Sequence, residues 1–441
     1  MHGLRTQTRR SRTAVALVVA LGLTLAACSD AESGAKVGGG ANADIEAATD
    51  PAGPKPTKSP IKIGLEVSLT GTTASSYFGV QPTAEAWATW VNETQGGING
   101  HPVSIEVRDT KGDAGATLAG AKELMADESV LAMLIADSQA EGVLAEPLES
   151  SGVPVIGGSS VSTESQGVRT NYFTTGSMNP YYMVGLLKAA KATGATKVGA
   201  VVCAESPECA HISGLFKSAS GEIGLDYTGT VAVAASAPNY TAPCLSLIGK
   251  GTDFAAVVVA GAVLLRVAKD CNGQGYKGTF GAAGQSVLPG EFGQLDGLKM
   301  AGTIQGFPWW STAKPVKRYV SVMKRYMSKS DFDDLAWANG SATNIWASLE
   351  LFRKANAEMS DSPTRAEVTD AYHQIKDETL DGLLPNPITF TAGKPASPNN
   401  CFWTYSYEDK QFTTVEPDGE SGNGVSGDLA TTCVEVGAFS E

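Results

Sequence analysis

Residues 62–113 read KIGLEVSLTGTTASSYFGVQPTAEAWATWVNETQGGINGHPVSIEVRDTKGD, and this stretch decides the fold. A strand is predicted over residues 61–69, followed by a loop of hydroxyl-bearing residues and glycines at 70–79. A helix comes next, because apolar residues recur every three or four positions, at Val80, Ala84, Trp87 and Val91. Two glycines, Gly96 and Gly97, end this helix before a second strand at 103–109. The stretch is therefore a strand–helix–strand unit.

The same alternation continues to residue 158. The predicted elements are a helix at 116–127, a strand at 130–137, a helix at 142–150 and a strand at 153–158. These strands are apolar throughout rather than at every second position. Such strands, alternating with helices, indicate a parallel sheet that is covered on both faces.

A second run of the pattern follows, with strands at 197–203, 228–233, 254–262 and 278–283, separated by helices such as 210–221 and 263–270. A return strand is predicted at 302–307, and then helices near 315–328, 337–358 and 364–375. Residues 401–416 predict a β-hairpin that turns at Glu408-Asp409-Lys410, and the tail after it is rich in turn residues. Two runs of one alternation imply two similar α/β lobes.

The N-terminus predicts export. A cluster of positive residues (Arg5, Arg9, Arg10 and Arg12) precedes an apolar segment at 14–23 and the small residues Ala26 and Ala27, as in a secretory signal peptide. The segment is shorter than the roughly 20 apolar residues that a membrane-spanning helix needs. Leu25-Ala26-Ala27-Cys28 resembles a bacterial lipobox, in which the cysteine thiol is lipidated and becomes the first residue of the mature chain. The alternative is a chance cysteine behind an ordinary signal.

Residues 28–60 predict a stalk between this lipid and the fold, since Gly, Ala, Ser and Pro predominate and large apolar side chains are almost absent. No later stretch is long enough to cross a bilayer, so we expect a chain that is exported and tethered by Cys28 to the outer face of the cell membrane.

Charge argues against a nucleic-acid partner. The 441-residue chain holds 33 Lys and Arg residues against 46 Asp and Glu residues. Removing residues 1–27, which hold four arginines and no acids, leaves 29 basic residues and a formal charge near −17. A nucleic-acid-binding protein would need a basic face.

Six cysteines remain when Cys28 is lipidated, and an even number in an oxidising compartment favours disulfides. Six thiols allow fifteen pairings, and spacing alone does not choose among them. We expect neighbours along the chain to pair, as Cys203–Cys209, Cys244–Cys271 and Cys401–Cys433. No metal or other cofactor is expected, because the three histidines after residue 27 have no recognised ligand spacing.

Enzyme signatures are missing from the sequence, which has no GxSxG elbow, no HExxH pair and no Walker A loop. Residues 422–427 match GxGxxG, but no strand is predicted before them and no helix after them. We therefore expect a protein that is not an enzyme.

The loops after the predicted strands carry more information. Ligands of doubly wound sheets bind beyond the carboxyl ends of the strands. These loops, at 68–77, 137–142, 157–163, 204–209 and 282–287, are rich in hydroxyl groups and glycines. Each precedes a helix whose first N–H groups would suit a carboxylate or another small polar group. Helix capping is the alternative for any single loop. Asp137-Ser138 and Gly158-Ser159-Ser160 together favour binding.

At this point the sequence resembles the leucine/isoleucine/valine-type solute-binding proteins of ABC importers, which have the type I periplasmic-binding fold. The resemblance rests on residues 62–113, above all Gly96-Gly97-Ile98-Asn99-Gly100, and on AEPLESSGVPVIGGSS at 145–160. It covers roughly residues 61–416 and is thin after 310.

The resemblance implies two doubly wound lobes with parallel central sheets, joined by three crossings near 176–179, 302–307 and 350–358. Lobe 1 would comprise 61–177 and 304–354, lobe 2 would comprise 178–303 and 355–416, and 417–441 would be a tail. A small-molecule ligand would be enclosed when the lobes close on this hinge.

The resemblance also implies site residues. Ser138 beside Asp137, and Gly158 to Ser160, would hold the carboxylate of an amino acid, and Tyr77 or Phe78 would line the wall. No acidic residue stands at Ala283-Gly284-Gln285-Ser286, where relatives that bind amino acids hold the ammonium group. Glu205 or Glu208 would substitute. Otherwise amides, short carboxylates and aromatic acids are open as ligands.

Two further residues near a predicted crossing, Trp309 and Trp310, would either stack on a planar ligand or pack in the core. The function expected from all of this is that of a monomeric, lipid-anchored binding protein that delivers its ligand to the permease subunits of an ABC importer. A ligand-sensing receptor of the same fold, and an exported α/β hydrolase, are the alternatives.

Overall fold

The computed structural model describes residues 45–159, 161–205, 207–415, 421–426 and 429–435. Cys28 and Ser160 lie outside these residues, as do the predicted signal peptide and the first part of the predicted stalk. None of the helices in the described part is both long and apolar enough to cross a bilayer.

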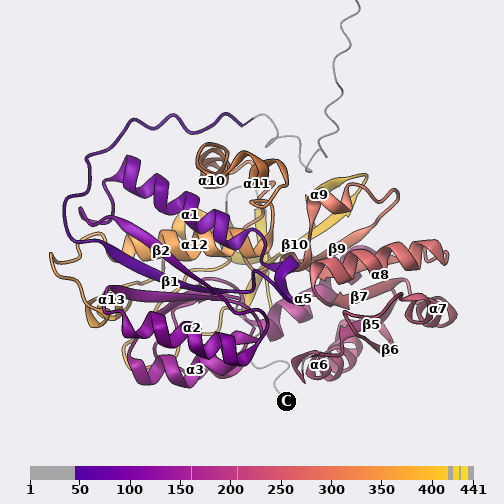
Figure 1. Ribbon diagram of the computed structural model, residues 1–441. Coiled ribbons are helices and arrows are strands. Elements are labelled where there is room, and N and C mark those ends of the chain that lie inside the picture. Colours follow the sequence, from indigo (N-terminus) through magenta and orange to yellow (C-terminus); the bar gives the residue numbers. More distant parts are fainter. Residues whose placement is uncertain (1–44, 160, 206, 416–420, 427–428, 436–441) are drawn as a thin grey trace, which may run out of the picture. The chain divides into compact units, whose positions relative to one another are not determined.

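The first sheet has four parallel strands in the order β2-β1-β3-β4. These are β1 (Ile61–Val67), β2 (Val103–Asp109), β3 (Val130–Ala136) and β4 (Val155–Gly158). Helices α2 (Ala114–Ala126) and α3 (Ala140–Ser151) cover one face, and α1 (Val80–Trp90) and α12 (Gly340–Ala355) cover the other (Figure 1). Every residue of β3 is buried, as expected for a strand between two helical layers.

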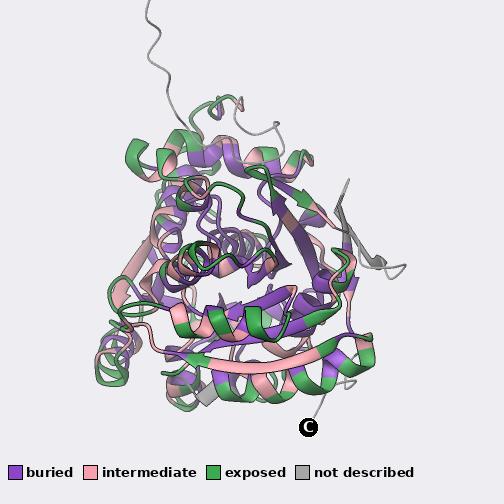
Figure 2. Cartoon of the chain, turned by 90° about the vertical axis from the view of Figure 1, so that its right-hand side faces the viewer, coloured by how far each residue is buried: buried purple, intermediate pink, exposed green. Residues whose placement is uncertain are grey.

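The second sheet continues the alternation. Five parallel strands lie in the order β6-β5-β7-β8-β9: β5 (Lys197–Cys203), β6 (Asp226–Val233), β7 (Phe254–Val258), β8 (Thr279–Ala283) and β9 (Met300–Ile304). Its helices are α5 (Asn179–Ala192), α6 (Pro207–Ile223), α7 (Thr241–Gly249) and α8 (Gly261–Gly273). Strands β7, β8 and β9 are largely buried, whereas most residues of the edge strand β6 are only partly buried, and Figure 2 shows buried, intermediate and exposed residues along the chain. The predicted α/β class with parallel central sheets is confirmed.

Antiparallel strands complete the second sheet. Strand β10 (Cys401–Glu408) pairs with β9, with β11 (Gln411–Thr414) and with β13 (Leu429–Cys433), which in turn pairs with β12 (Ser421–Ser426). The predicted hairpin turns at Asp409 and Lys410, which both have positive φ angles. The segment expected to be a turn-rich tail, 417–441, contains β12 and β13, which extend the sheet.

Shorter elements and two further helices connect these parts. They are η1 (Ala74–Ser76), η2 (Val91–Gln95), α4 (Thr163–Gln166), η3 (Gly284–Ser286), α9 (Pro289–Phe292), α10 (Lys314–Tyr326), α11 (Lys329–Asp333), α13 (Arg365–Tyr372) and η4 (Leu380–Gly382).

Three disulfides join the pairs Cys203–Cys209, Cys244–Cys271 and Cys401–Cys433, as neighbour pairing predicts. The third links β10 to β13 at a position where these residues are also paired in the sheet. It therefore fixes the added hairpin to the parallel sheet.

The segment before β1 differs from the expected stalk. Ala48 is buried, its N–H donates to the Ser321 carbonyl of α10, and Asp50 forms an ion pair with Arg318. Further along, the N–H groups of Thr57 and Lys58 donate to the Gly100 carbonyl. Residues 45–60 are thus held against the first sheet and its helices. Backbone hydrogen bonds and one buried alanine hold them there, although the segment has few large apolar side chains.

The GGING motif makes this attachment possible. Gly97 has a φ angle of 73°, and a Cβ atom there would lie 2.1 Å from the His101 carbonyl oxygen. A tight turn at this point lets His101 hydrogen-bond the Ser59 and Ser360 carbonyls, 2.7 and 2.9 Å away. The motif therefore has a structural role: it forms the turn from which His101 bonds the segments around residues 59 and 360.

The chain passes three times between the two sheets. The first passage follows residue 173 and the second follows β9. The third was expected near 350–358, but α13 contacts β3, and Arg365 donates to the Val130 carbonyl. Phe390 also packs on Phe173, beside the first sheet. The passage therefore falls between 391 and 400, and residues 355–390 belong with the first sheet rather than the second.

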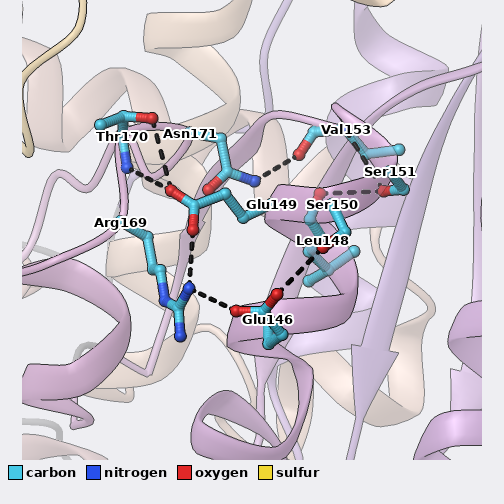
Figure 3. Close-up of polar contacts among 9 residues, drawn as sticks. All are labelled: Glu146, Leu148, Glu149, Ser150, Ser151, Val153, Arg169, Thr170 and Asn171. Atoms are coloured by element: carbon cyan, nitrogen blue, oxygen red, sulfur yellow. Dashed lines mark hydrogen bonds and ion pairs between the residues drawn. The ribbon is translucent and has the colours of Figure 1, made fainter.

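The first passage is fixed by contacts around the end of α3 (Figure 3). Arg169 forms ion pairs with Glu146 and Glu149, both 2.7 Å, and the Asn171 side-chain amide donates to the Val153 carbonyl. Phe173 then donates its N–H to Val155 of β4. The segment is thus tied to β4 immediately before it crosses.

Candidate functional site

A cavity of about 120 Å³ lies at the carboxyl ends of both sheets, where the sequence predicts a ligand site. The first sheet contributes polar residues from the loops after β1 and β3, namely Thr72, Thr73, Ser76, Tyr77, Ser138 and Gln139. The second contributes mostly apolar residues, among them Met183, Ile212, Val233, Val257, Val259 and Val263. The cavity is therefore polar on one side and apolar on the other.

Tyr77 lies at the polar side of the cavity. Its hydroxyl accepts a hydrogen bond from the Ser138 N–H at 3.0 Å, and the residue is 2 % exposed. Burial, together with the nearby charge of Asp137, raises the pKa of Tyr77 well above its usual value. The phenol is thus neutral, and it occupies the Ser138 N–H that was expected to face a ligand.

Asp137 is buried behind this wall and is not among the residues that line the cavity. Its carboxyl accepts from the Thr110 hydroxyl at 2.5 Å and from the Gln139 N–H at 2.9 Å, so it caps α3. Burial raises its pKa. Asp137 was expected to contact the ligand, but in the structure its carboxyl group has a structural role.

Gly158 and Ser159 line a second, much smaller cavity of about 10 Å³ behind Tyr77. The Ser159 N–H donates to the Ile135 carbonyl at 2.8 Å, and the Gly158 carbonyl accepts from Asn344 at 2.6 Å. Tyr77 and Gln285 line both cavities, whereas Ser138 lines only the larger one. Phe78 packs partly buried against the core and is absent from the cavity lining.

On the opposite side, Glu205 and Gln285 both line the larger cavity. The Glu205 carboxylate is exposed and accepts from the Ala204 and Ala235 N–H groups at 3.1 and 2.6 Å, which links the loops after β5 and β6. The Cys203–Cys209 disulfide also lines the cavity. The side chain of Glu208 lies outside the described part of the structure.

Contacts across the cavity mouth join the two sheets' loops. The N–H groups of Gly261 and Ala262, at the start of α8, donate to the hydroxyls of Ser76 and Ser75 at 3.3 and 3.0 Å. Ser341 at the start of α12 donates to the Ser76 carbonyl at 2.9 Å. Short element η1 thus touches both the opposite wall and α12.

Sequence reasoning missed the apolar wall and the two polar residues of α5. The run at 254–262 contains some of the wall residues, among them Val257 and Val259, but nothing in it distinguishes a strand end that faces a cavity from one that faces a helix. Asn179 and Tyr182 directly follow the first passage between the sheets. This position in the sequence is the signal by which they could have been predicted to line the cavity.

Trp309 and Trp310 belong to the core rather than to this cavity. Trp310 stacks on Phe412 of β11 with ring centroids 5.3 Å apart, and Trp309 is fully buried. In the described part of the chain, no group of three or more His, Cys, Asp or Glu side chains could hold a metal ion.

The profile of the periplasmic binding protein family matches residues 60–411. A search of curated proteins finds no match.

Solved structures share the fold at low sequence identity. A fatty acid ABC transporter substrate-binding protein from Thermomonospora curvata is 17 % identical, with a TM-score of 0.66 over 86 % of this chain and 96 % of that one. A leucine-binding protein, LivK, from Thermotoga maritima is 14 % identical, with a TM-score of 0.65 over 81 % of this chain and 99 % of that one. A substrate-binding periplasmic protein from Ralstonia solanacearum gives a TM-score of 0.68 at 14 % identity, over 80 % and 99 %.

Proposed function

Because the chain belongs to the periplasmic binding protein family, we propose that it is a lipid-anchored solute-binding protein of an ABC importer. Members of this family are ligand-binding proteins and receptors that act outside the cytoplasm, and the structure has their type I fold. In this proposal, the protein captures a small organic ligand between its two sheets and delivers it to a membrane permease.

The cavity between the sheets is the observation that carries the proposal. Its lining comes from the carboxyl ends of β1 and β3 on one side and of β5, β6, β7 and β8 on the other. A ligand held there would contact both sheets at once and would favour the arrangement in which η1 meets α8. Two of the solved relatives are described as binding fatty acids and leucine, which supports a small organic solute.

The lobes that close on the ligand would be built around the two sheets, with residues 355–390 in the first. Binding residues in the proposal are Tyr77, Ser138 and Gln285, which line the cavity, whereas Glu205 lines it and joins two loops. Capture and release, with no chemical change in the ligand, is the proposed activity, and the protein would act as a monomer.

A ligand screen tests the proposal. Thermal unfolding of the purified chain from residue 28 onward, with Cys28→Ser, would be measured with amino acids, amides, short carboxylates and aromatic acids. A ligand at a hundred times its Kd is expected to add about 2.7 kcal/mol to the free energy of unfolding. Cells that lack the protein should also lose uptake of that compound. Binding without any effect on uptake would favour a sensing receptor, and conversion of the compound would show an enzyme.

Replacing Cys28 by alanine tests the proposed anchor. The thiol at residue 28 follows the Leu25-Ala26-Ala27 pattern of a lipidation site. We expect the C28A protein to lose incorporation of a labelled fatty acid and to leave the membrane fraction, since removal of the acyl chains removes their buried CH₂ groups. The S29A variant keeps the thiol and is the control. Undiminished labelling of the C28A protein would contradict an anchor at this residue.

A further inference from the structure

The cavity contains few charges. Among the described residues that line it, none is lysine, arginine or histidine, and Glu205 is the one acidic side chain. Burying an ionised carboxylate without a cation or a set of free N–H donors costs several kcal/mol. Whether this site accepts an anion therefore depends on the helix N-termini around it.

The N-terminus of α3 is already filled by an acid from the chain itself. The Asp137 carboxyl accepts the Gln139 N–H, and its backbone carbonyl accepts the Ala140 N–H. The same carboxyl is close enough to Tyr77 to contribute to its raised pKa. A ligand carboxylate at Ser138 would thus meet a second acid instead of free donors.

Three further N–H donors at the described edge of the cavity are also occupied. Tyr77 takes the Ser138 N–H, and Ser75 and Ser76 take the first two N–H groups of α8. These are the positions at which a carboxylate would otherwise be bound. The protein satisfies each of them with an uncharged hydroxyl group.

Glu205 is poorly suited to hold an ammonium group. Both of its oxygens already accept backbone N–H groups, from Ala204 and Ala235, and the side chain is exposed to solvent. An exposed ion pair contributes little, commonly about 0–1 kcal/mol. The structure uses this carboxylate to join two loops.

Neutral polar groups at the end of the cavity are, by contrast, available. The side-chain oxygen of Asn179 is buried and has no hydrogen-bond partner among the described residues. The hydroxyl of Tyr182 is buried beside the amides of Gln285 and Gln305. These groups can bind an amide or a hydroxyl without any charge.

The rest of the wall is aliphatic. Val233, Val257, Val259 and Val263 line it with Met183 and Ile212, and an engineered cavity of about 150 Å³ with similar lining binds benzene. Burying a small branched or aromatic group here would contribute about 25 cal/mol for each Å² of apolar surface.

We propose that the ligand of this cavity is an electrically neutral molecule with a compact apolar body and an amide or hydroxyl end, rather than an α-amino acid or a free carboxylate. The apolar body lies against β7 and α8, and the polar end lies at Asn179 and Tyr182. This inference rests on the proposed function, because it concerns what the same cavity binds.

Compounds that share one body and differ in charge test the inference. Calorimetric titration of the purified protein at pH 7 would compare 3-methylbutanamide with 3-methylbutanoate, 3-methylbutylamine and leucine. A second set would be benzamide, benzoate, benzylamine and phenylalanine. In at least one set we expect the amide to bind roughly tenfold or more tightly than each charged partner, as the loss of one charge-assisted pairing would give.

A variant tests whether the charge of Glu205 contributes to binding of the amide. Glu205→Gln removes the one acidic group among the described residues that line the cavity, and amide affinity should stay within about threefold of the original. Tenfold weaker amide binding by this variant would overturn the inference. So would a carboxylate, an amine or an amino acid that binds as tightly as the amide, and so would the absence of binding by both amides.

These outcomes are distinguishable from failure of the proposed function. A charged compound that binds in the cavity would overturn the inference and leave a solute-binding protein. The proposed function fails if no class of solute in the wider screen binds, or if uptake does not depend on the protein.

Discussion

Replacing Gly158 by alanine is expected to lower the free energy of unfolding by about 3 kcal/mol or more. Gly158 has a φ angle of 153°, which side-chain-bearing residues rarely adopt, and a Cβ atom would lie 1.9 Å from the Ile135 carbonyl oxygen. That oxygen belongs to the neighbouring strand β3 and accepts the Ser159 N–H. It cannot move without separating β4 from β3.

Chemical denaturation followed by circular dichroism measures this loss. Gly152→Ala is the matched control, because Gly152 also has a positive φ angle, 69°, but nothing lies within 4 Å of its added Cβ atom. The control should cost only about 1–2 kcal/mol. Equal losses in both variants would show that backbone strain alone accounts for the effect and that the contact with β3 contributes nothing.

Replacing Ala260 by phenylalanine is expected to weaken ligand binding at least a hundredfold, or by about 2.7 kcal/mol. Ala260 lines the cavity immediately before α8, and a phenyl ring there would occupy much of its roughly 120 Å³. The ring would lie where the apolar body of the ligand is proposed to bind. The free energy of unfolding should change little, because the ring fills existing space beside aliphatic side chains.

Titration of the compound found in the screen measures the effect of A260F. Ala262→Phe makes the same change two residues further on, at an exposed position outside the cavity lining. It should bind with the original affinity. If A260F bound the ligand as tightly as A262F does, the ligand would have to bind elsewhere than in this cavity.

The sheets were predictable because their signals are local. Buried strands such as β3 are apolar throughout, and intervening helices repeat apolar residues every three to four positions. Helix α13 is a different case. Its own sequence does not specify which sheet it packs on, and the contact of Arg365 with the Val130 carbonyl joins residues far apart in the chain.

Two other errors came from composition. Residues 45–60 have few large apolar side chains, yet backbone hydrogen bonds and the Asp50–Arg318 ion pair hold them in place. Strand β12 consists largely of glycine and serine, which predict a turn. It pairs with β13, and a disulfide ties β13 to β10.

The position of the cavity was predictable, but the contacts of each side chain around it were not. Carboxyl ends of parallel strands meet at one edge, so Ser138 and Gln285 were expected near a ligand, and both line the cavity. Asp137 caps a helix instead, and Tyr77 binds the Ser138 N–H. Choosing between such roles requires side-chain directions, which a residue pattern does not contain.

The hydrogen bonds between η1 and the start of α8 affect how ligand binding changes the conformation of the protein. Each such bond contributes about 0.5–1.5 kcal/mol net, because water replaces it when the partners separate. A bound solute that contributes a few kcal/mol exceeds either of these hydrogen bonds and would change the populations of two conformations more than tenfold. Because the hydrogen bonds between η1 and α8 are weak, the conformation of the protein would depend on whether a ligand is bound.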